Sequence, residues 1–293
     1  MRDLAGGLTL AADFVPDIPV GRGVESVLQW LLSNAGGFFA AIRFVLAWLV
    51  SSLEAALTAP PSWAMILAFA GIALWAKGWW LAAFTAVSFL LIESMGHFEA
   101  TMLTLALVLI AALLAVVIGV PTGILAARKQ SVSTVVRPVL DFMQTMPAFV
   151  YLLLAVLFFR IGVVPGVMAS LVFSMPPAVR LTELGIRQVD PEVVEAARAF
   201  GARPREVLTG VQLPLAMPSI MAGINQVIML ALSMVVIAGL AGAGGLGGLI
   251  VEGVQRLRVG LGVEGGLAVV ILAIFLDRVT SAVGGRAKRA TTG

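Results

Sequence analysis

The chain has 293 residues, of which 60% are hydrophobic and only 12% are charged, and its mean hydropathy is +1.05. This composition excludes both a soluble globular domain and a disordered chain, so we expect a membrane protein. The absence of cysteine excludes a disulfide framework, a thiol nucleophile and a cysteine metal site, and a single histidine leaves little with which to build any other metal site.

The first region, residues 1–58, carries two patterns. Residues 1–20 contain acids and prolines and lack the charged-then-apolar order of a signal peptide, so we expect a polar tail. Ser26–Leu57 is mostly apolar, but two charged residues interrupt it and Gly36-Gly37 breaks its helical pattern. For this segment we favour amphipathic helices in the membrane interface over an additional, eighth span.

The second region, residues 59–94, predicts a two-helix membrane hairpin. Apolar runs at Trp63–Trp75 and Trp79–Ile92 flank Lys77. Tryptophan is common where a span meets water, which suits Trp75, Trp79 and Trp80 at the turn.

The third region, residues 95–293, predicts five membrane spans. Its charge-free runs reach the roughly 18 apolar residues that cross a hydrocarbon core of about 30 Å. The expected spans are Thr101–Ala127, Val135–Phe159, Val163–Val179, Pro214–Leu240 and Val263–Val283. Pro147, Pro176 and Pro177 are candidate hinges within them.

The distribution of arginine and lysine predicts the orientation. Basic residues cluster at 128–137, at 180–205 and from 278 onward. The other connections between spans carry few basic residues, or carry acidic residues that balance their charge. The positive-inside rule makes these three clusters cytoplasmic. Seven spans then give a cytoplasmic C-terminus and an external N-terminus, with Asp277-Arg278 as an anchor at the inner interface.

A polar segment, Asp190–Pro214, lies between the third and fourth of these five spans and is here called the elbow. Asp190 is a good helix N-cap, Pro191 suits the first helical position, and Gly201 is placed to end the helix in a left-handed turn. Pro204 then opens a second short helix that we expect to end near Gly210. The elbow is predicted to be two cytoplasmic helices within a loop of about residues 180–213.

Helix-turn-helix patterns also occur in DNA-binding proteins, but the charge of this one argues against nucleic acid. Residues 180–206 hold five arginines and five acids, a net charge of zero, whereas a phosphate-binding surface is basic. The small residues of Glu195-Ala196-Ala197 allow a partner surface to approach closely. We interpret this helix as a docking helix for another protein.

The elbow resembles the EAA loop of ABC importer permeases. The similarity lies in Glu195-Ala196-Ala197, in Gly201 four residues later, and in Val211-Gln212-Leu213-Pro214, where Val211 replaces the usual isoleucine. Further segments resemble the permeases of glycine betaine and proline betaine importers, among them LDFMQTMPAFVYLLL, SMPPAVRLTELGIRQV and ILAIFLDRVTSA. The resemblance extends from about Thr101 to the C-terminus.

This resemblance implies an all-α polytopic inner-membrane protein with a MetI-like five-helix core and extra N-terminal helices. It implies a homodimer of permeases in the lipid bilayer, a cytoplasmic ABC ATPase that holds the ATP and Mg²⁺, and an extracytoplasmic substrate-binding protein. The chain has no G-x-x-x-x-G-K-[ST] motif with which to bind ATP itself, and no cofactor is expected on it. The ATPase-coupling loop would comprise Asp190, Glu195, Ala196, Ala197, Gly201, Leu213 and Pro214.

Polar and thioether side chains inside the apolar spans mark a candidate translocation path. Amides are costly in hydrocarbon unless they face protein or a water-filled path, although hydrogen bonding between helices explains each of them equally well. The candidates are Met143, Gln144, Thr145, Met146, Met221, Asn225, Met229 and Ser233. Tyr151 is the only tyrosine and the tryptophans lie outside the five spans, so no high-affinity aromatic cage for a quaternary amine is expected.

Gly242, Gly244 and Gly247 form a G-x-G-x-x-G pattern. A dinucleotide fingerprint would need a preceding strand in a βαβ unit, and this pattern follows a membrane helix. We interpret it as a flexible, closely packed external turn, and as a candidate external gate or surface for the binding protein.

Two other classes of function fit the sequence less well. An ion-coupled secondary transporter would need intramembrane carboxylates or inverted repeats, and only Asp141 comes close. A hydrolase would need a nucleophile with a base in reach, and His97 is expected to be solvated in an external loop. We therefore predict the non-enzymatic permease of an ATP-driven importer of glycine betaine, proline betaine or related quaternary amines, with choline, carnitine or an amino acid as alternative solutes.

Overall fold

The computed structural model describes residues 20–292, and these are almost entirely helical. They divide into two compact units between Ile42 and Arg43. No strand occurs in the described part of the chain. The polar tail predicted for residues 1–20 falls almost wholly outside it, as do the basic side chains that follow residue 284.

The first described helix is α2, Val20–Thr58, and it contains a kink at Ala35. The predicted break at Gly36-Gly37 is thus displaced by one residue. The stretch Gly21–Thr58 is long and apolar enough to cross a membrane. Both alternatives for this segment, helices in the membrane interface and an eighth span, stay predictions.

The predicted hairpin is present as α3, Ser62–Lys77, and α4, Trp79–Ser94, which pack against each other. Each has 16 residues, fewer than the roughly 20 that usually cross a bilayer. Phe69 of α3 and Phe89 of α4 contact Phe275 of the last helix, with ring centroids 5.4 and 5.5 Å apart. These aromatic contacts hold the hairpin against the core.

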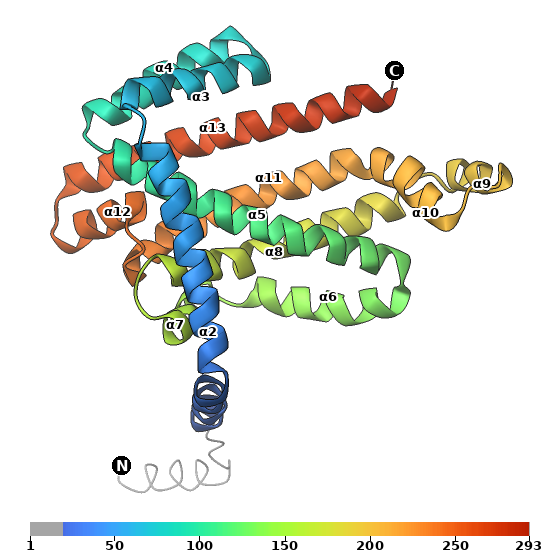
Figure 1. Cartoon of the computed structure of the whole chain (residues 1–293), viewed down its shortest axis with the longest axis horizontal. Coiled ribbons are helices and arrows are strands. Elements are labelled where there is room, and N and C mark those ends of the chain that lie inside the picture. The colour runs from blue at the N-terminus through green and yellow to red at the C-terminus, as the bar shows by residue number, and fades with distance from the viewer. Residues whose placement is uncertain (1–19, 293) are drawn as a thin grey trace, which may run out of the picture. The chain divides into compact units, whose positions relative to one another are not determined.

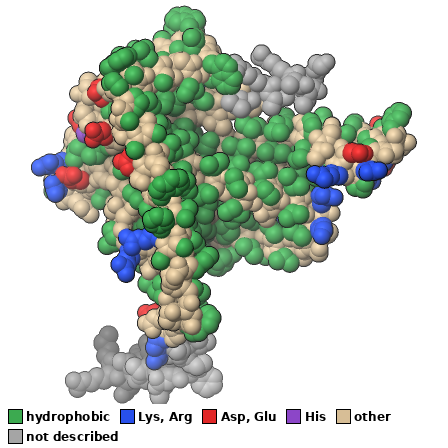
Figure 2. Space-filling view, in the orientation of Figure 1, with side chains coloured by type: hydrophobic (Ala, Val, Ile, Leu, Met, Phe, Trp, Pro, Cys, Tyr) green, Lys and Arg blue, Asp and Glu red, His purple; other side chains and the backbone are tan. Residues whose placement is uncertain are grey.

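The core consists of long helices arranged side by side (Figure 1). They are α5 (Phe98–Arg128), α6 (Gln130–Thr145), α8 (Val163–Arg187), α11 (Leu213–Ile237) and α13 (Val259–Thr292), and two short helices, α7 (Ala148–Phe159) and α12 (Gly245–Gln255), lie at the end of the core away from α9 (Pro191–Ala199). The pair α5 and α8 lies centrally, with α6 on one side and α11 followed by α13 on the other. Figure 2 shows apolar side chains over the middle of these helices and charged ones toward their two ends, as in a protein surrounded by lipid.

Two glycines allow α5 and α8 to pack closely. Gly119 and Gly123 form a G-x-x-x-G pattern on one face of α5. A Cβ on Gly119 would come within 2.7 Å of the Ala178 Cβ, and one on Gly123 within 2.6 Å of the Val179 carbonyl oxygen. The central helix pair therefore depends on the absence of side chains at these positions.

The predicted span Val135–Phe159 is not one straight helix. Helices α6 and α7 are separated at Met146-Pro147 and bent by 99°. Pro147 is thus confirmed as the position of a break, because its ring fixes the backbone and it lacks an N–H for the helix. The other candidate hinges, Pro176 and Pro177, are buried within the continuous helix α8.

The prediction that His97 is solvated is wrong. Its side chain is only 12% exposed, and its Nε2 lies 2.8 Å from Oε2 of Glu264 in α13. This pair joins the start of α5 to the start of α13. The sequence did not indicate it because the two residues are 167 positions apart.

We predict that Gly123→Ala lowers the stability of the purified protein by about 1–3 kcal/mol, because the new methyl group collides with the Val179 carbonyl oxygen and the Thr182 side chain of α8. Gly71→Ala is the control, since a Cβ at this glycine in the middle of α3 meets nothing within 4 Å. Thermal unfolding in detergent measures both. Equal stability of the two variants would contradict the close α5–α8 contact.

Candidate functional site: the elbow and the broken helix

The first helix of the elbow, α9, spans Pro191–Ala199. The Asp190 side chain accepts a hydrogen bond of 2.9 Å from the backbone N–H of Glu192, and Pro191 occupies the first helical position. Both features confirm the sequence prediction. The carboxylate satisfies a backbone donor at the positive end of the helix dipole.

The turn after α9 is fixed by backbone hydrogen bonds. Gly201 adopts a φ of +87°, its N–H donates to the Arg198 carbonyl at 2.9 Å, and the N–H of Ala202 donates to the Ala197 carbonyl at 3.1 Å. This pair of bonds is the Schellman motif, in which a left-handed glycine ends a helix. The predicted left-handed turn at Gly201 is therefore confirmed.

The second half of the elbow differs from the prediction. Helix α10, Pro204–Val207, does not end near Gly210 but continues through a π-helical turn, Leu208–Gln212, into α11. Leu213 and Pro214 form the first turn of α11. The wider π turn directly precedes Pro214, whose ring would clash with the carbonyl four residues earlier in a regular α-helix.

The two faces of α9 have different environments. Val194 is buried against Val189 and Val207, with Ala197 packed beside this cluster. Glu195 and Ala196 are exposed, and Phe200 at the end of the helix is 91% exposed. One face holds the elbow together, and the other presents a carboxylate, a small residue and an unpacked aromatic ring.

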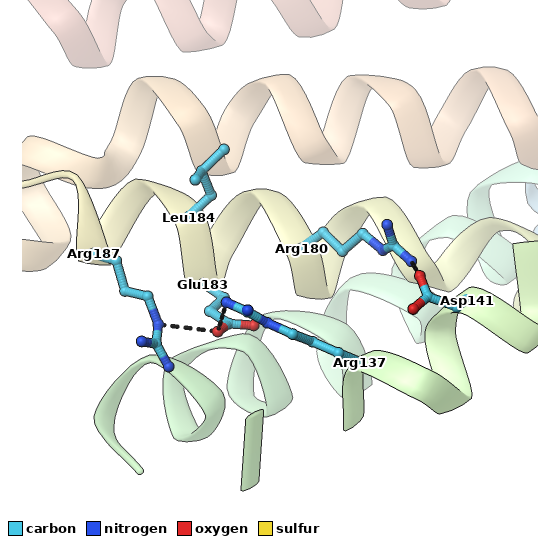
Figure 3. Close-up of a pocket in the computed structure, with 6 residues that line it drawn as sticks. All are labelled: Arg137, Asp141, Arg180, Glu183, Leu184 and Arg187. Atoms are coloured by element: carbon cyan, nitrogen blue, oxygen red, sulfur yellow. Dashed lines mark hydrogen bonds and ion pairs between the residues drawn. The ribbon is translucent and has the colours of Figure 1, made fainter. Parts of the chain in front are cut away.

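A buried carboxylate holds the last turns of α8, just before the elbow (Figure 3). Glu183 is 4% exposed, and its Oε1 accepts a hydrogen bond of 2.7 Å from Ser133 Oγ. The same oxygen lies 2.9 Å from Nη2 of Arg137 and 3.0 Å from Nε of Arg187. Ser133 and Arg137 belong to α6, so the cluster fastens α6 to α8.

The same cluster reaches the end of α5. Nη2 of Arg187 donates to the Ala126 carbonyl at 2.9 Å and to Oε1 of Gln130 at 3.0 Å. One turn closer to the bend, Arg180 pairs with Asp141 of α6. The side chains surround a cavity of about 320 Å³. The elbow thus begins three residues after an arginine that contacts α5, α6 and α8.

The break between α6 and α7 is stabilised by Tyr151. In a regular helix the Met143 carbonyl would accept from the N–H of residue 147, but Pro147 has no N–H. The buried Tyr151 hydroxyl donates to this carbonyl instead. The tyrosine therefore supplies the donor that the proline lacks and ties the first turn of α7 to the last turn of α6.

The candidate path residues near this break have mixed environments. Met143 is buried, Met146 is half-buried, and Gln144 and Thr145 are exposed. The Thr145 hydroxyl donates to the Phe142 carbonyl within its own helix. The four residues lie together at the end of α6.

The candidates on α11 form a second group. Met221, Asn225 and Met229 are half-buried and Ser233 is exposed. Asn225 Nδ2 donates to Oδ1 of Asp277 at 2.9 Å, so Asp277, expected to be an interfacial anchor, joins α13 to α11. The Asn225 Oδ1 is buried and has no partner among the described residues.

The structure does not bring the two groups together in one chain. Helix α6 packs mainly against α5 and α8, and α11 packs against the other side of this pair and against α13 (Figure 1). Among the described residues, no cluster of three or more acids and histidines could hold a metal ion.

Two of the candidate gate glycines, Gly242 and Gly244, lie between α11 and α12, and the third, Gly247, lies in the first turn of α12. Gly242 and Gly244 have φ values of +74° and +76°, and a Cβ on Gly247 would come within 2.5 Å of the Val236 carbonyl oxygen. The N–H of Leu246 donates to Thr104 Oγ1 of α5 at 2.8 Å. The turn is closely packed, as predicted, and it leads into α12, a helix that the sequence interpretation missed.

Sequence reasoning also missed four residues of this site. The exposed aromatic ring of Phe200 in a polar loop was a usable signal. Glu183, Tyr151 and Asp277 gave no comparable local signal, because their partners lie on other helices or across the bend.

We predict that Tyr151→Phe destabilises the protein by about 1–3 kcal/mol, because the buried Met143 carbonyl loses its donor. Thr145→Val removes a hydroxyl from an exposed position at the same bend and should cost less. Chemical unfolding in detergent compares the variants. If Tyr151→Phe is as stable as the unmodified chain, the hydroxyl does not support the break.

Comparison with known proteins agrees with this architecture. A family described as "Binding-protein-dependent transport system inner membrane component" matches residues 119–289. The glycine betaine permease OpuAB of Bacillus subtilis is 49% identical over 92% of this chain and 95% of its own length. The glycine betaine/proline betaine permease ProW of Escherichia coli is 46% identical over 91% and 75%. The glycine betaine/carnitine permease GbuB of Listeria monocytogenes is 47% identical over 94% and 98%.

The fold is also similar to a solved transporter structure. A chain of the inward facing MetNI methionine ABC transporter superposes with a TM-score of 0.55 and 25% identity, covering 67% of this chain and 96% of that one. This likeness confirms the predicted MetI-like all-helical core. The chain belongs to the family of binding-protein-dependent transport system inner membrane components and, within it, to the glycine betaine/proline betaine permeases of ABC importers.

Proposed function

We propose that two copies of this chain form the solute path of an ATP-driven importer, each with a cytoplasmic ATPase bound to its elbow. The observation that carries the proposal is the outer face of α9, where Phe200 is 91% exposed beside Glu195 and Ala196. An exposed aromatic ring beside small residues is typical of the centre of a protein interface. The ATPase would hold the ATP and Mg²⁺, and this chain would carry out no hydrolysis.

The proposed solute is glycine betaine or proline betaine. The three relatives described above, OpuAB, ProW and GbuB, are named for glycine betaine, and two of them also for proline betaine or carnitine. An extracytoplasmic binding protein would select the solute and dock at the outer end, where Gly242, Gly244 and Gly247 lie. The elbow and the C-terminus would be cytoplasmic and the N-terminus external, as the basic residues indicate.

The Glu183 cluster provides a physical route from the ATPase to the path. Closure of the ATPase dimer would move α9, which follows α8 after three residues. Because Glu183 and Arg187 connect the end of α8 to α6 and α5, these helices would move with the elbow. The broken helix α6–α7 would then alternate between two positions, each favoured by one nucleotide state.

Reconstitution tests the function directly. Proteoliposomes that contain this chain, its ATPase and its binding protein should accumulate glycine betaine only with internal ATP. Uptake should cease without the binding protein. Accumulation by this chain alone, driven by a sodium or proton gradient, would instead support a secondary transporter.

A second prediction tests the elbow. Phe200→Ala should weaken association with the ATPase by about 10- to 100-fold, because removal of a central aromatic anchor costs about 1–3 kcal/mol. Leu257→Ala is the control, since Leu257 is also strongly exposed but lies between α12 and α13, at the other end of the core (Figure 1). Co-purification in detergent and titration of the ATPase measure both. Equal affinity of the two variants would place the ATPase elsewhere.

A further inference from the structure

The bend between α6 and α7 encloses a cavity of about 320 Å³ against α8. Aromatic rings line much of it, from Phe142, Tyr151, Phe158 and Phe159. Three thioethers complete this part of the lining, from Met143, Met146 and Met168. Two of these methionines, Met143 and Met146, are among the candidate path residues.

The bend creates this lining. A continuous helix through residues 142–159 would carry Phe142 and Phe158 away from each other along its axis, about 24 Å apart at about 1.5 Å per residue. The 99° bend at Pro147 sets α7 roughly perpendicular to α6, and residues of both helices line the cavity. The hydroxyl of Tyr151 holds this arrangement through the Met143 carbonyl, so that its ring is fixed at the cavity wall.

The chemistry of the lining selects one class of ligand. The faces of aromatic rings attract cations, and thioether sulfur is polarizable and adaptable. Among the described residues that line the cavity, none has a carboxylate, a side-chain amide or a basic group. A metal ion would lose its coordinating water oxygens there and a primary ammonium would lose its hydrogen bonds, whereas a quaternary ammonium has no N–H to satisfy and presents only alkyl groups.

The absence of a carboxylate also limits the strength of binding. A cation held by aromatic rings and sulfur alone gains a modest energy from each ring, and this suits a position that a solute must leave again. No high-affinity aromatic cage is expected from the sequence, because the chain has a single tyrosine and its tryptophans lie outside the five spans. The phenylalanines that complete this one come together only because the helix is broken.

We propose that this cavity binds the quaternary ammonium head of the solute during its passage through the permease. The inference rests on the proposed function, and it places one solute-binding position of the path in this cavity. Lipid acyl chains and apolar side chains of a second copy are the competing occupants.

Binding can be measured with methyl-labelled methionine in the assembled complex in nanodiscs. On titration with choline, the methyl signals of Met143, Met146 and Met168 should shift saturably, whereas those of Met65 and Met95, which do not line the cavity, should not. The uncharged isostere 3,3-dimethylbutan-1-ol should bind about tenfold or more weakly, because it lacks the charge that the rings attract. An equal response to both compounds, or none at the three methionines, would overturn the proposal.

Matched variants separate this inference from the proposed function. Phe142→Leu and Phe158→Leu keep apolar bulk but remove a ring, so each should weaken choline binding by about two- to tenfold and slow glycine betaine uptake. Phe149→Leu makes the same change in α7 at a residue that lines a different cavity, and both measurements should remain unchanged.

The uptake results then distinguish the two ideas. If the unmodified complex accumulates glycine betaine and both cavity variants bind choline and transport as it does, the cavity inference is wrong and the proposed function stands. If the unmodified complex accumulates no quaternary amine, the proposed function itself is wrong.

Discussion

The organisation of this permease depends on one buried carboxylate, that of Glu183. A carboxylate removed from water is strongly destabilising unless hydrogen bonds and opposite charges compensate it. Here Ser133, Arg137 and Arg187 do so, and they belong to two helices that the chain reaches before and after the break at Pro147. Because losing any partner would leave the charge less well compensated, α6 is held against α8 at the point where the elbow begins.

At the break between α6 and α7, the polar group that needs a partner is a backbone carbonyl and not a charged side chain. Membrane-spanning segments must satisfy their polar groups internally, and Pro147 removes the donor for the Met143 carbonyl. A single hydroxyl, from Tyr151, resolves this and also sets the direction of α7. The Glu183 cluster therefore fixes one end of α6 to α8 and Tyr151 fixes the other end to α7, so that α6 links the elbow to the bend as one rigid element.

Features that depend on residues close together in the sequence were predicted more accurately than features that depend on residues far apart in it. The start and end of α9 were predicted correctly because Asp190, Pro191 and Gly201 act within a few residues of themselves. The five-helix core was indicated by long apolar runs. The 99° bend and the burial of His97 against Glu264 were not predicted, because each depends on contacts between residues that are not neighbours in the sequence. The continuation of α10 into α11 was not predicted either, although the π turn and Pro214 that accompany it are local features. The position of the break, though not its angle, was predictable from Pro147.

The separation of the two groups of path candidates bears on how a path could form. The α6–α7 bend and the Asn225–Asp277 pair lie on opposite sides of the α5–α8 pair, so one chain does not enclose a channel between them. Closely packed glycines at Gly119 and Gly123 leave no room for solute within that pair. A path that uses either group must therefore be completed by another surface. Under the proposed function this surface belongs to a second copy of the permease. Motion passed from the ATPase through the rigid α6 would then act at the interface between the two copies and not within one of them.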